Sequence, residues 1–353
     1  MKIAFFSTKQ YDREFFDRVN KDFGYEIVFF ESRLKDRTAP LTKGFDAVCV
    51  FVNDEINAEV LKALNEAGVK LLLLRSAGFN NVDLCAAYYN KIRIARVPAY
   101  SPNSVAEHAA ALMMSLNRKI VRAYNRVRDG NFSLEGLVGF EVHDKKIGIV
   151  GTGKIGVCFA KIMLGFGAEV LAYDPFVNPE LERLGVKYLP LEEVFKMSDV
   201  ISLHVPLIPE TQHLINEGSI KGMKKGVMIL NTSRGALIDT SAVINALKSG
   251  QIGSLALDVY EEEANIFFKD LSGQVLQDDI FARLLTFPNV LITGHQGFFT
   301  DTALLHIAQT TLSNMRDFEH GALKPGNEVT CDRLKLKTDC GRPCGRADKQ
   351  VNP

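Results

Sequence analysis

Three residues that could carry acid–base chemistry follow separate apolar runs in the second half of the chain. Arg234 comes after VMILNTS, Glu263 closes the segment LDVYEEE, and His295 follows VLITG. A guanidinium can bind a carboxylate through two parallel hydrogen bonds. An imidazole exchanges a proton near neutral pH, and a carboxylate beside it orients the ring and favours its charged form. Together the three suit reduction of a 2-oxo acid, in which the substrate carboxylate is held while the ketone oxygen gains a proton.

Each of these residues also has a simple structural explanation. A histidine at a strand end, an arginine after a strand and a run of glutamates are all common on solvated surfaces without any catalytic role. Spacing alone therefore leaves both interpretations open. The catalytic interpretation depends on the three residues occurring together behind a nucleotide-binding motif.

That motif is GIVGTGKIG, which places Gly151, Gly153 and Gly156 between an apolar run and a helical pattern. Such glycines allow a tight turn, close approach of a pyrophosphate and close helix packing, and the helix N-terminus attracts the phosphate charge. Asp174 ends the next run, VLAYD, 18 residues after Gly156. A carboxylate there can bind the adenosine ribose hydroxyls and repel a 2′-phosphate, so the motif predicts NAD rather than NADP.

Apolar runs alternate with helical patterns along the chain, and these elements must position the motifs. The runs that predict strands are KIAFFS, YEIVFF, FDAVCVFVN, VKLLLLRSAG and IRIARVP, then KKIGIVG, AEVLAYD, DVISLHVP, VMILNTS, GSLALDVY and VLITGHQ. Near-continuous apolar strands separated by helices indicate parallel sheets covered on both faces, with ligands beyond the carboxyl ends of the strands. We predict an α/β fold of two doubly wound parallel-sheet domains, a Rossmann NAD-binding domain inserted in a flavodoxin-like substrate domain.

Two helical patterns set the predicted domain boundaries. Ser104 and Glu107 resemble a capping box that opens a long helix, whose apolar stripe continues as far as Ala123. A second helix after Thr300 is expected to return to the first domain. The predicted domains are 1–100 with 299–330 for the substrate and 101–298 for NAD, and the tail 331–353, which has little apolar content, is expected to be disordered.

Composition narrows the class of protein. The 42 basic and 42 acidic side chains cancel, which argues against nucleic acid or an anionic membrane as a partner. No apolar run is long enough for a signal peptide or a membrane span, so a cytoplasmic location is expected. Three cysteines lie singly in apolar segments, and three more lie in the tail without a nearby histidine, so no metal site is predicted. The two groups are Cys49, Cys85 and Cys158, and Cys331, Cys340 and Cys344.

NTSRGALID, LDVYEEE and GHQ, in this order behind GTGKIG, resemble the D-isomer-specific 2-hydroxyacid dehydrogenases. The segments RSAGFNNVDL, RVPAYSP and LNRKIVRAYNR are similar to the fermentative D-lactate dehydrogenases of bacteria within that family. The resemblance covers residues 1–330. Val205 departs from it, since many relatives have a cysteine there, and the tail does not resemble the family.

The resemblance implies a role for each matching residue. Arg234 would bind the substrate carboxylate and carbonyl, His295 would be the acid and base, and Glu263 would be its partner. Substrate-binding residues would be the backbone of Ala77 and Gly78 and the rings of Phe51, Tyr100 and Phe298. Residues for NAD, from the motif and the resemblance together, would be Gly151, Gly153, Lys154, Ile155, Gly156, Asp174, Val205, Pro206, Thr232 and Asp258.

The implied activity is reversible NADH-dependent reduction of pyruvate to D-lactate in fermentation, by a homodimer or homotetramer. A related activity, such as glyoxylate or hydroxypyruvate reduction, is the alternative within the family. A binding protein on the same fold that senses NAD, like the C-terminal-binding-type corepressors, is the alternative from another class.

Overall fold

The computed structural model describes residues 1–330 and divides the chain into two compact units. The first unit consists of Met1–Ser101 and the segment that begins at Thr300, and the second unit is Pro102–Phe299. The sequence placed the two boundaries one residue earlier. The expected disorder of 331–353, and Cys331, Cys340 and Cys344, lie outside the described residues.

Within residues 1–330, the first unit contains a six-stranded sheet in the order β13-β5-β4-β3-β1-β2, parallel except for β13 at one edge. Its strands are β1 (Lys2–Phe5), β2 (Glu26–Phe29), β3 (Ala47–Val50), β4 (Leu71–Leu74), β5 (Arg93–Arg96) and β13 (Glu328–Val329). Its helices are α1 (Gln10–Asn20), η1 (Ala39–Thr42), α2 (Ala58–Glu66), α3 (Leu84–Tyr89) and α12 (Asp301–Glu319).

The second unit, all of it within the described part of the chain, contains a seven-stranded parallel sheet in the order β12-β11-β10-β9-β6-β7-β8. Its strands are β6 (Lys146–Val150), β7 (Glu169–Tyr173), β8 (Lys187–Tyr188), β9 (Val200–Leu203), β10 (Val227–Asn231), β11 (Ile252–Leu257) and β12 (Val290–Ile292). Its helices are α4 (Pro102–Asn117), α5 (Ile120–Arg128), α6 (Lys154–Gly165), α7 (Pro179–Arg183), α8 (Leu191–Met197), α9 (Glu217–Lys221), η2 (Gly235–Leu237), α10 (Thr240–Ser249), η3 (Glu263–Asn265) and α11 (Asp279–Leu285).

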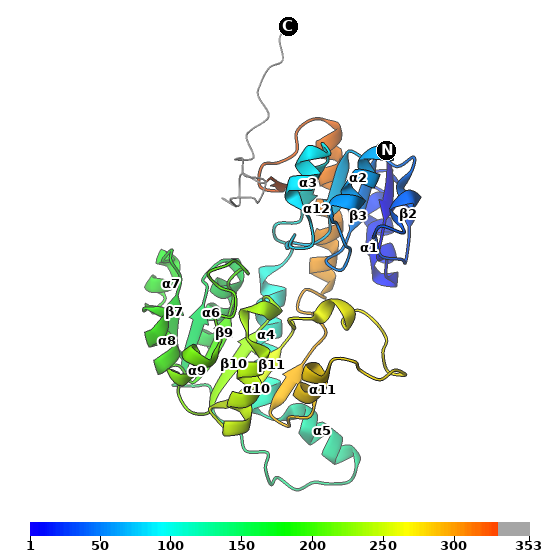
Figure 1. Ribbon diagram of the computed structural model, residues 1–353. Helices are drawn as coiled ribbons and strands as arrows, with labels where there is room; N and C mark the ends of the chain where they lie inside the picture. The colour runs from blue at the N-terminus through cyan, green and yellow to red at the C-terminus, as the bar shows by residue number, and fades with distance from the viewer. Residues whose placement is uncertain (331–353) are drawn as a thin grey trace. The chain divides into compact units, whose positions relative to one another are not determined.

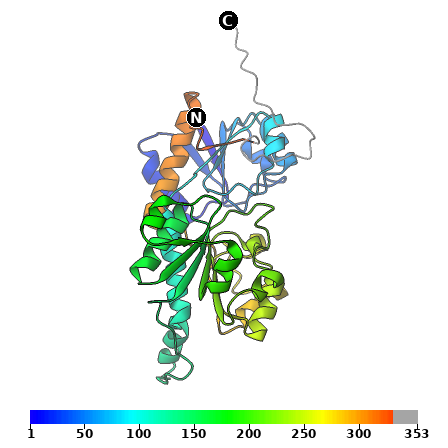
Figure 2. The ribbon, with the colours of Figure 1, turned by 90° about the vertical axis from the view of Figure 1, so that its left-hand side faces the viewer.

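Helices cover both faces of each sheet, as Figures 1 and 2 show. Successive side chains of β10 point to opposite faces of the sheet. Ile229 belongs to the apolar cluster with α8 to α11, whereas Met228 and Leu230 belong to the cluster with α4 and α6. A strand buried on both faces needs apolar residues at every position, which explains why these strands read as continuous apolar runs. The predicted fold class, two doubly wound parallel sheets, is confirmed.

The predicted capping box at Ser104 is wrong. Helix α4 begins two residues earlier, at Pro102, whose fixed φ suits the first helical turn. The buried Ser104 hydroxyl instead donates a hydrogen bond to the carbonyl oxygen of Gly297, 3.0 Å away. The side chain therefore connects α4 to the segment after β12.

The single long helix predicted through Ala123 is also wrong. Helix α4 ends at Asn117, and Lys119 adopts a left-handed φ of 51° before α5 begins. Nine residues of α4 are buried and none of α5, so the apolar residues of the two segments do not form one stripe. The two-residue strands β8 and β13 were not predicted, because so short a segment carries no periodicity.

Among residues 1–330, no helix is both long and apolar enough to span a membrane. The same residues contain no cluster of three or more histidine, cysteine or acidic side chains with the geometry of a metal site.

Candidate active site

The glycine turn after β6 is shaped by close contacts that exclude side chains. Gly151 has a φ of 96°, and a Cβ there would lie 2.6 Å from the carbonyl oxygen of His204. A Cβ on Gly156 would lie 2.0 Å from the carbonyl oxygen of Gly151, so α6 can start this close to the turn only with glycine. A Cβ on Gly153 would have nothing within 4 Å, which leaves open space for a ligand to approach the backbone.

This turn fits a dinucleotide pyrophosphate. Gly153 is the N-cap of α6 and has no side chain to accept hydrogen bonds from the first turn, which includes Lys154 and Ile155. Those N–H groups and the positive end of the helix dipole therefore face an approaching anion.

The Asp174 carboxylate is fixed beside the glycine turn. One oxygen accepts from the backbone N–H of Thr152 at 2.7 Å and the other from the N–H of Phe176 at 2.8 Å. Each oxygen keeps a lone pair for a ribose hydroxyl.

Three further predicted NAD residues follow the neighbouring strands. Val205 and Pro206 follow β9, and the Val205 side chain would lie 2.9 Å from a Cβ on Gly151. Thr232 follows β10, and its hydroxyl is buried without a hydrogen-bond partner among residues 1–330. An unsatisfied buried hydroxyl at this edge of the sheet fits a polar group of a bound cofactor.

His204 lies next to the turn and is uncharged at neutral pH. Its ring contacts the Phe159 ring, with centroids 5.1 Å apart, and its Nε2 lies 2.9 Å from the Ser202 hydroxyl. Burial lowers the pKa of the His204 imidazole to about 4. The sequence left open a cofactor contact for this ring, and the structure adds that the His204 backbone lies against Gly151.

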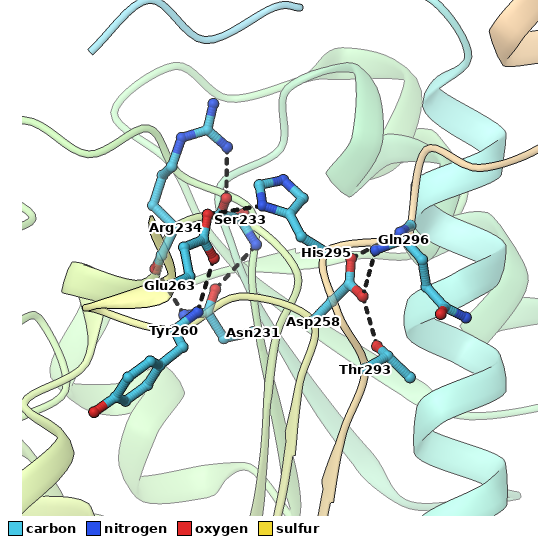
Figure 3. Close-up of polar contacts among 10 residues, drawn as sticks. Asn231, Ser233, Arg234, Asp258, Tyr260, Glu263, Thr293, His295 and Gln296 are labelled. Atoms are coloured by element: carbon cyan, nitrogen blue, oxygen red, sulfur yellow. Dashed lines mark hydrogen bonds and ion pairs between the residues drawn. The ribbon is translucent and has the colours of Figure 1, made fainter. Parts of the chain in front are cut away.

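The predicted catalytic residues come together at the carboxyl ends of β10, β11 and β12, which are neighbours in the sheet. Nδ1 of His295 lies 2.8 Å from Oε1 of Glu263 (Figure 3). Oε2 of Glu263 accepts from the Tyr260 N–H at 3.0 Å, which fixes the carboxylate. A carboxylate can only accept, so Nδ1 carries a proton and Nε2 is the nitrogen left to face a substrate.

Arg234 enters the same site from the end of β10, and Figure 3 shows its guanidinium on the same side of the strand ends as the His295 ring. The sequence missed Asn231, a fully buried residue that fixes the Arg234 backbone. The Asn231 amide donates to the Arg234 carbonyl oxygen at 2.8 Å and accepts from the Ser233 N–H at 3.0 Å. Nothing in the spacing of NTSRG distinguished this asparagine from an ordinary strand end.

His295 adopts a left-handed φ of 56°, which is uncommon for a residue other than glycine. The Asp258 carboxylate holds the backbone that follows it. Its Oδ1 accepts from the Gln296 N–H at 2.9 Å, and its Oδ2 accepts from the Gly297 N–H at 2.7 Å (Figure 3). Strained backbone persists where surrounding contacts over-determine it, as they do here.

Asp258 has two side-chain partners as well, the Thr293 hydroxyl at 2.5 Å and Nε2 of His108 at 3.2 Å. Burial opposes ionisation, but the hydrogen bonds from His108, Thr293 and the Gln296 N–H outweigh it and lower the pKa of Asp258. The sequence left open a cofactor contact for His108, whereas the structure shows its ring bound to this carboxylate.

The predicted substrate-binding residues belong to both units. Phe298 is buried in the second unit, two residues after Gln296. The other four lie in the first unit, after strands β3, β4 and β5, and they are Phe51, Ala77, Gly78 and Tyr100.

Comparison with known proteins identifies the relatives of this chain. Residues 110–297 match the family model described as D-isomer specific 2-hydroxyacid dehydrogenase, NAD binding domain. That match confirms the prediction of NAD as the cofactor. The D-lactate dehydrogenase of Escherichia coli (strain K12) is 54% identical over 329 residues, which cover 93% of this chain and 100% of that protein.

Two solved structures extend the similarity. The apo-structure of D-lactate dehydrogenase from Escherichia coli aligns with a TM-score of 0.86 at 52% identity, covering 94% of this chain and 100% of that one. The pyruvate reductase of Chlamydomonas reinhardtii aligns with a TM-score of 0.87 at 47% identity, covering 91% and 97%.

Replacing Asp258 by asparagine tests whether its carboxylate holds His295 in place. An amide can accept hydrogen bonds through one oxygen only, so the N–H of Gln296 or of Gly297 loses its acceptor. We expect the turnover number to fall by on the order of tenfold to a hundredfold, because a small displacement of a catalytic group is costly. Steady-state kinetics checks this, with Asp270→Asn as the control, since the Asp270 carboxylate accepts from the N–H and hydroxyl of Ser272 and is not one of the proposed site residues. Unchanged turnover in a folded Asp258→Asn enzyme would contradict the role.

The pKa of His204 predicts how stability depends on pH. The unfolded histidine takes up a proton near its ordinary pKa of 6.5, whereas the folded one resists protonation down to about 4. The neutral His204 side chain therefore contributes fully to the free energy of unfolding above pH 6.5. This contribution is lost as the pH falls toward 4, at up to about 1.4 kcal/mol per pH unit. Denaturant unfolding of His204→Gln should show a shallower pH dependence in this window, whereas the exposed control His143→Gln should follow the unaltered protein. Parallel curves for all three proteins would rule out this linkage.

Proposed function

Because this chain belongs to the D-isomer specific 2-hydroxyacid dehydrogenases, we propose that it catalyses the reversible reduction of pyruvate to D-lactate with NADH, as in fermentation. The observation that carries the proposal is the 2.8 Å contact between His295 and Glu263, in the unit that also holds the glycine turn and Arg234. Relatives named D-lactate dehydrogenase and pyruvate reductase support pyruvate as the substrate.

Arg234 binds the substrate in this proposal. Its planar guanidinium accommodates the pyruvate carboxylate and compensates the negative charge that develops on the ketone oxygen. The Asn231 amide holds the Arg234 backbone, so the charge is positioned before substrate arrives. When bound, NADH supplies the hydride that reduces the carbonyl carbon.

His295 supplies the proton. Its Nε2 donates to the ketone oxygen while its Nδ1 stays hydrogen-bonded to Glu263. In the reverse direction the same nitrogen accepts the hydroxyl proton of D-lactate. Glu263 thus fixes which nitrogen faces the substrate.

The remaining residues serve binding. The backbone of Ala77 and Gly78 would help hold the carboxylate, and the rings of Phe51, Tyr100 and Phe298 would surround the methyl group. The NAD contacts would come from Gly151, Gly153, Lys154, Ile155, Gly156, Asp174, Val205, Pro206, Thr232 and Asp258.

A cytoplasmic homodimer or homotetramer completes the proposal. Apolar side chains at least half exposed gather on α5 and the segment after it. They are Ile120, Val121, Tyr124, Val127, Phe132, Leu134 and Val138. Exposed apolar side chains gathered in this way favour a contact with another protein, here a second copy of the chain.

The decisive experiment compares substrates side by side. Oxidation of NADH with pyruvate, glyoxylate and hydroxypyruvate should show the highest kcat/KM for pyruvate, and chiral analysis should find only D-lactate. NADPH should support much slower turnover, because the Asp174 carboxylate repels a 2′-phosphate. A preference for glyoxylate or hydroxypyruvate would assign the enzyme to a related activity. Absence of turnover with all three would favour an NAD-sensing binding protein.

Replacing His295 by glutamine tests the proton donor. Glutamine keeps a polar side chain but cannot transfer a proton, so we expect the rate to fall by on the order of 10² to 10⁴. NADH binding, followed by fluorescence, should be nearly unchanged. His143→Gln serves as the control because His143 is exposed, pairs with Asp144 and is not one of the proposed site residues. Near-normal turnover in His295→Gln would remove this residue from the mechanism.

A further inference from the structure

Asn81 connects two loops of the first unit that follow different strands. It lies in the loop after β4, together with Ala77 and Gly78, whereas Phe51 follows β3. The Asn81 amide donates to the carbonyl oxygen of Phe51 at 3.1 Å and to that of Asp54 at 2.9 Å. One side chain therefore binds the segment that carries a proposed substrate ring to the segment whose backbone is proposed to hold the substrate carboxylate.

Asn81 also contacts the β3 loop through its backbone. Its carbonyl oxygen accepts from the Ile56 N–H at 3.1 Å, and the Ile56 carbonyl accepts from the Asp83 N–H at 2.9 Å. Ile56 and Val82 form an isolated parallel bridge between the loops. The two loops thus run side by side, and the Asn81 side chain extends this pairing back toward Phe51.

The other groups of Phe51 are fixed as well. Its N–H donates to Oδ2 of Asp54 at 2.6 Å, and its ring lies 4.8 Å from the buried guanidinium of Arg75. Asp54 is held in turn by the Ser7 hydroxyl and the Leu34 N–H, both at 2.7 Å. The Phe51 carbonyl oxygen accepts from the Asp54 N–H at 3.2 Å as well, so the Asn81 amide adds to this carbonyl a contact that comes from the loop after β4.

The Ala77–Gly78 segment is held by a residue of the neighbouring strand β5 and by a residue of its own loop. Arg96 donates to the Ala77 carbonyl oxygen at 2.8 Å, and the Ser76 hydroxyl donates to that of Gly78 at 2.9 Å. Both carbonyls are thus occupied by protein donors. Each segment is therefore held by contacts of its own, and the Asn81 side chain joins the loop that carries Ala77 and Gly78 to the Phe51 carbonyl oxygen.

We propose that Asn81 is a positioning residue that sets the distance between the Phe51 ring and the Ala77–Gly78 backbone, and thereby the enzyme's preference for a methyl-sized substituent on the 2-oxo acid. The inference rests on the proposed function, because it takes those two segments as parts of the substrate site. Asn81 acts through Phe51 and the loop, without contact to the reacting atoms.

Asn81→Asp is the sharpest test, because it changes shape least. A carboxylate oxygen replaces the amide nitrogen opposite two carbonyl oxygens, so two hydrogen bonds are lost and like charges face each other. We expect KM for pyruvate to rise by on the order of tenfold to a hundredfold, with kcat changed less. The ratio of kcat/KM for pyruvate to that for 2-oxobutyrate, which is one methylene longer, should fall toward one. The dissociation constant of NADH should stay as in the unaltered enzyme.

Two further variants separate positioning from simple destabilisation. Asn81→Ala removes the amide without adding charge and serves where the aspartate variant does not fold. Asn90→Asp is the matched control, because the Asn90 amide also donates to a carbonyl oxygen, that of Ala86 at 2.8 Å, but away from both loops. A purely structural role would lower Tm in the Asn81 variants without shifting the ratio between the two substrates, and Asn90→Asp should leave that ratio unchanged.

Activity of the unaltered enzyme is measured first. If it reduces pyruvate or another 2-oxo acid and a folded Asn81 variant keeps the same KM and size preference, this inference alone is wrong. If the unaltered enzyme reduces no 2-oxo acid, the proposed function fails and this inference fails with it. A raised KM with relaxed size preference in Asn81→Asp and Asn81→Ala, absent from Asn90→Asp, supports it.

Discussion

The carboxylate of Asp258 is the group on which the geometry of the candidate active site depends. It lies at the end of β11, almost fully buried, and it accepts hydrogen bonds from two consecutive backbone N–H groups that follow His295. A buried carboxylate is costly unless its oxygens are satisfied, and here each has a backbone donor. These contacts hold His295 in a left-handed conformation, from which Nδ1 meets Glu263. The proposed acid–base residue is thus oriented by a side chain at the end of a neighbouring strand rather than by its own short strand β12.

In the second unit, Asp258 favours its charged form and His204 its neutral form, and the difference follows from their partners. Asp258 stays ionised because four donors surround its carboxylate. His204 stays neutral because burial disfavours its charged form and lowers the pKa of its imidazole to about 4. A neutral imidazole next to the glycine turn adds no charge beside the proposed pyrophosphate site, where the α6 N-terminus is the positive group. Gly151 and Gly156 allow this arrangement because a Cβ on either residue would lie too close to a backbone carbonyl oxygen.

The first unit fixes its proposed substrate segments with a buried polar cluster. Arg75 pairs with Asp12 at 3.2 Å, and its guanidinium lies between the rings of Phe5 and Phe51. A buried ion pair contributes little net stability compared with apolar residues of similar volume, but a precise set of partners favours one arrangement over others. Together with the Asn81 amide, this cluster accounts for how loops after separate strands keep a fixed spacing.

The sequence determined the features that depend on local pattern. Continuous apolar runs required strands buried on both faces, and the glycine spacing with Asp174 required a nucleotide turn, because each reflects residues near one another in the chain. The order of Arg234, Glu263 and His295 behind that turn indicated the candidate site.

Tertiary structure decided the features that depend on contacts between residues far apart in the chain. In helix α4 the Ser104 hydroxyl contacts Gly297, 193 residues away. Asp258 restrains the His295 segment across 38 and 39 residues, and Asn81 reaches Phe51 across 30. Such partners leave no trace in spacing, because the fold alone brings them together.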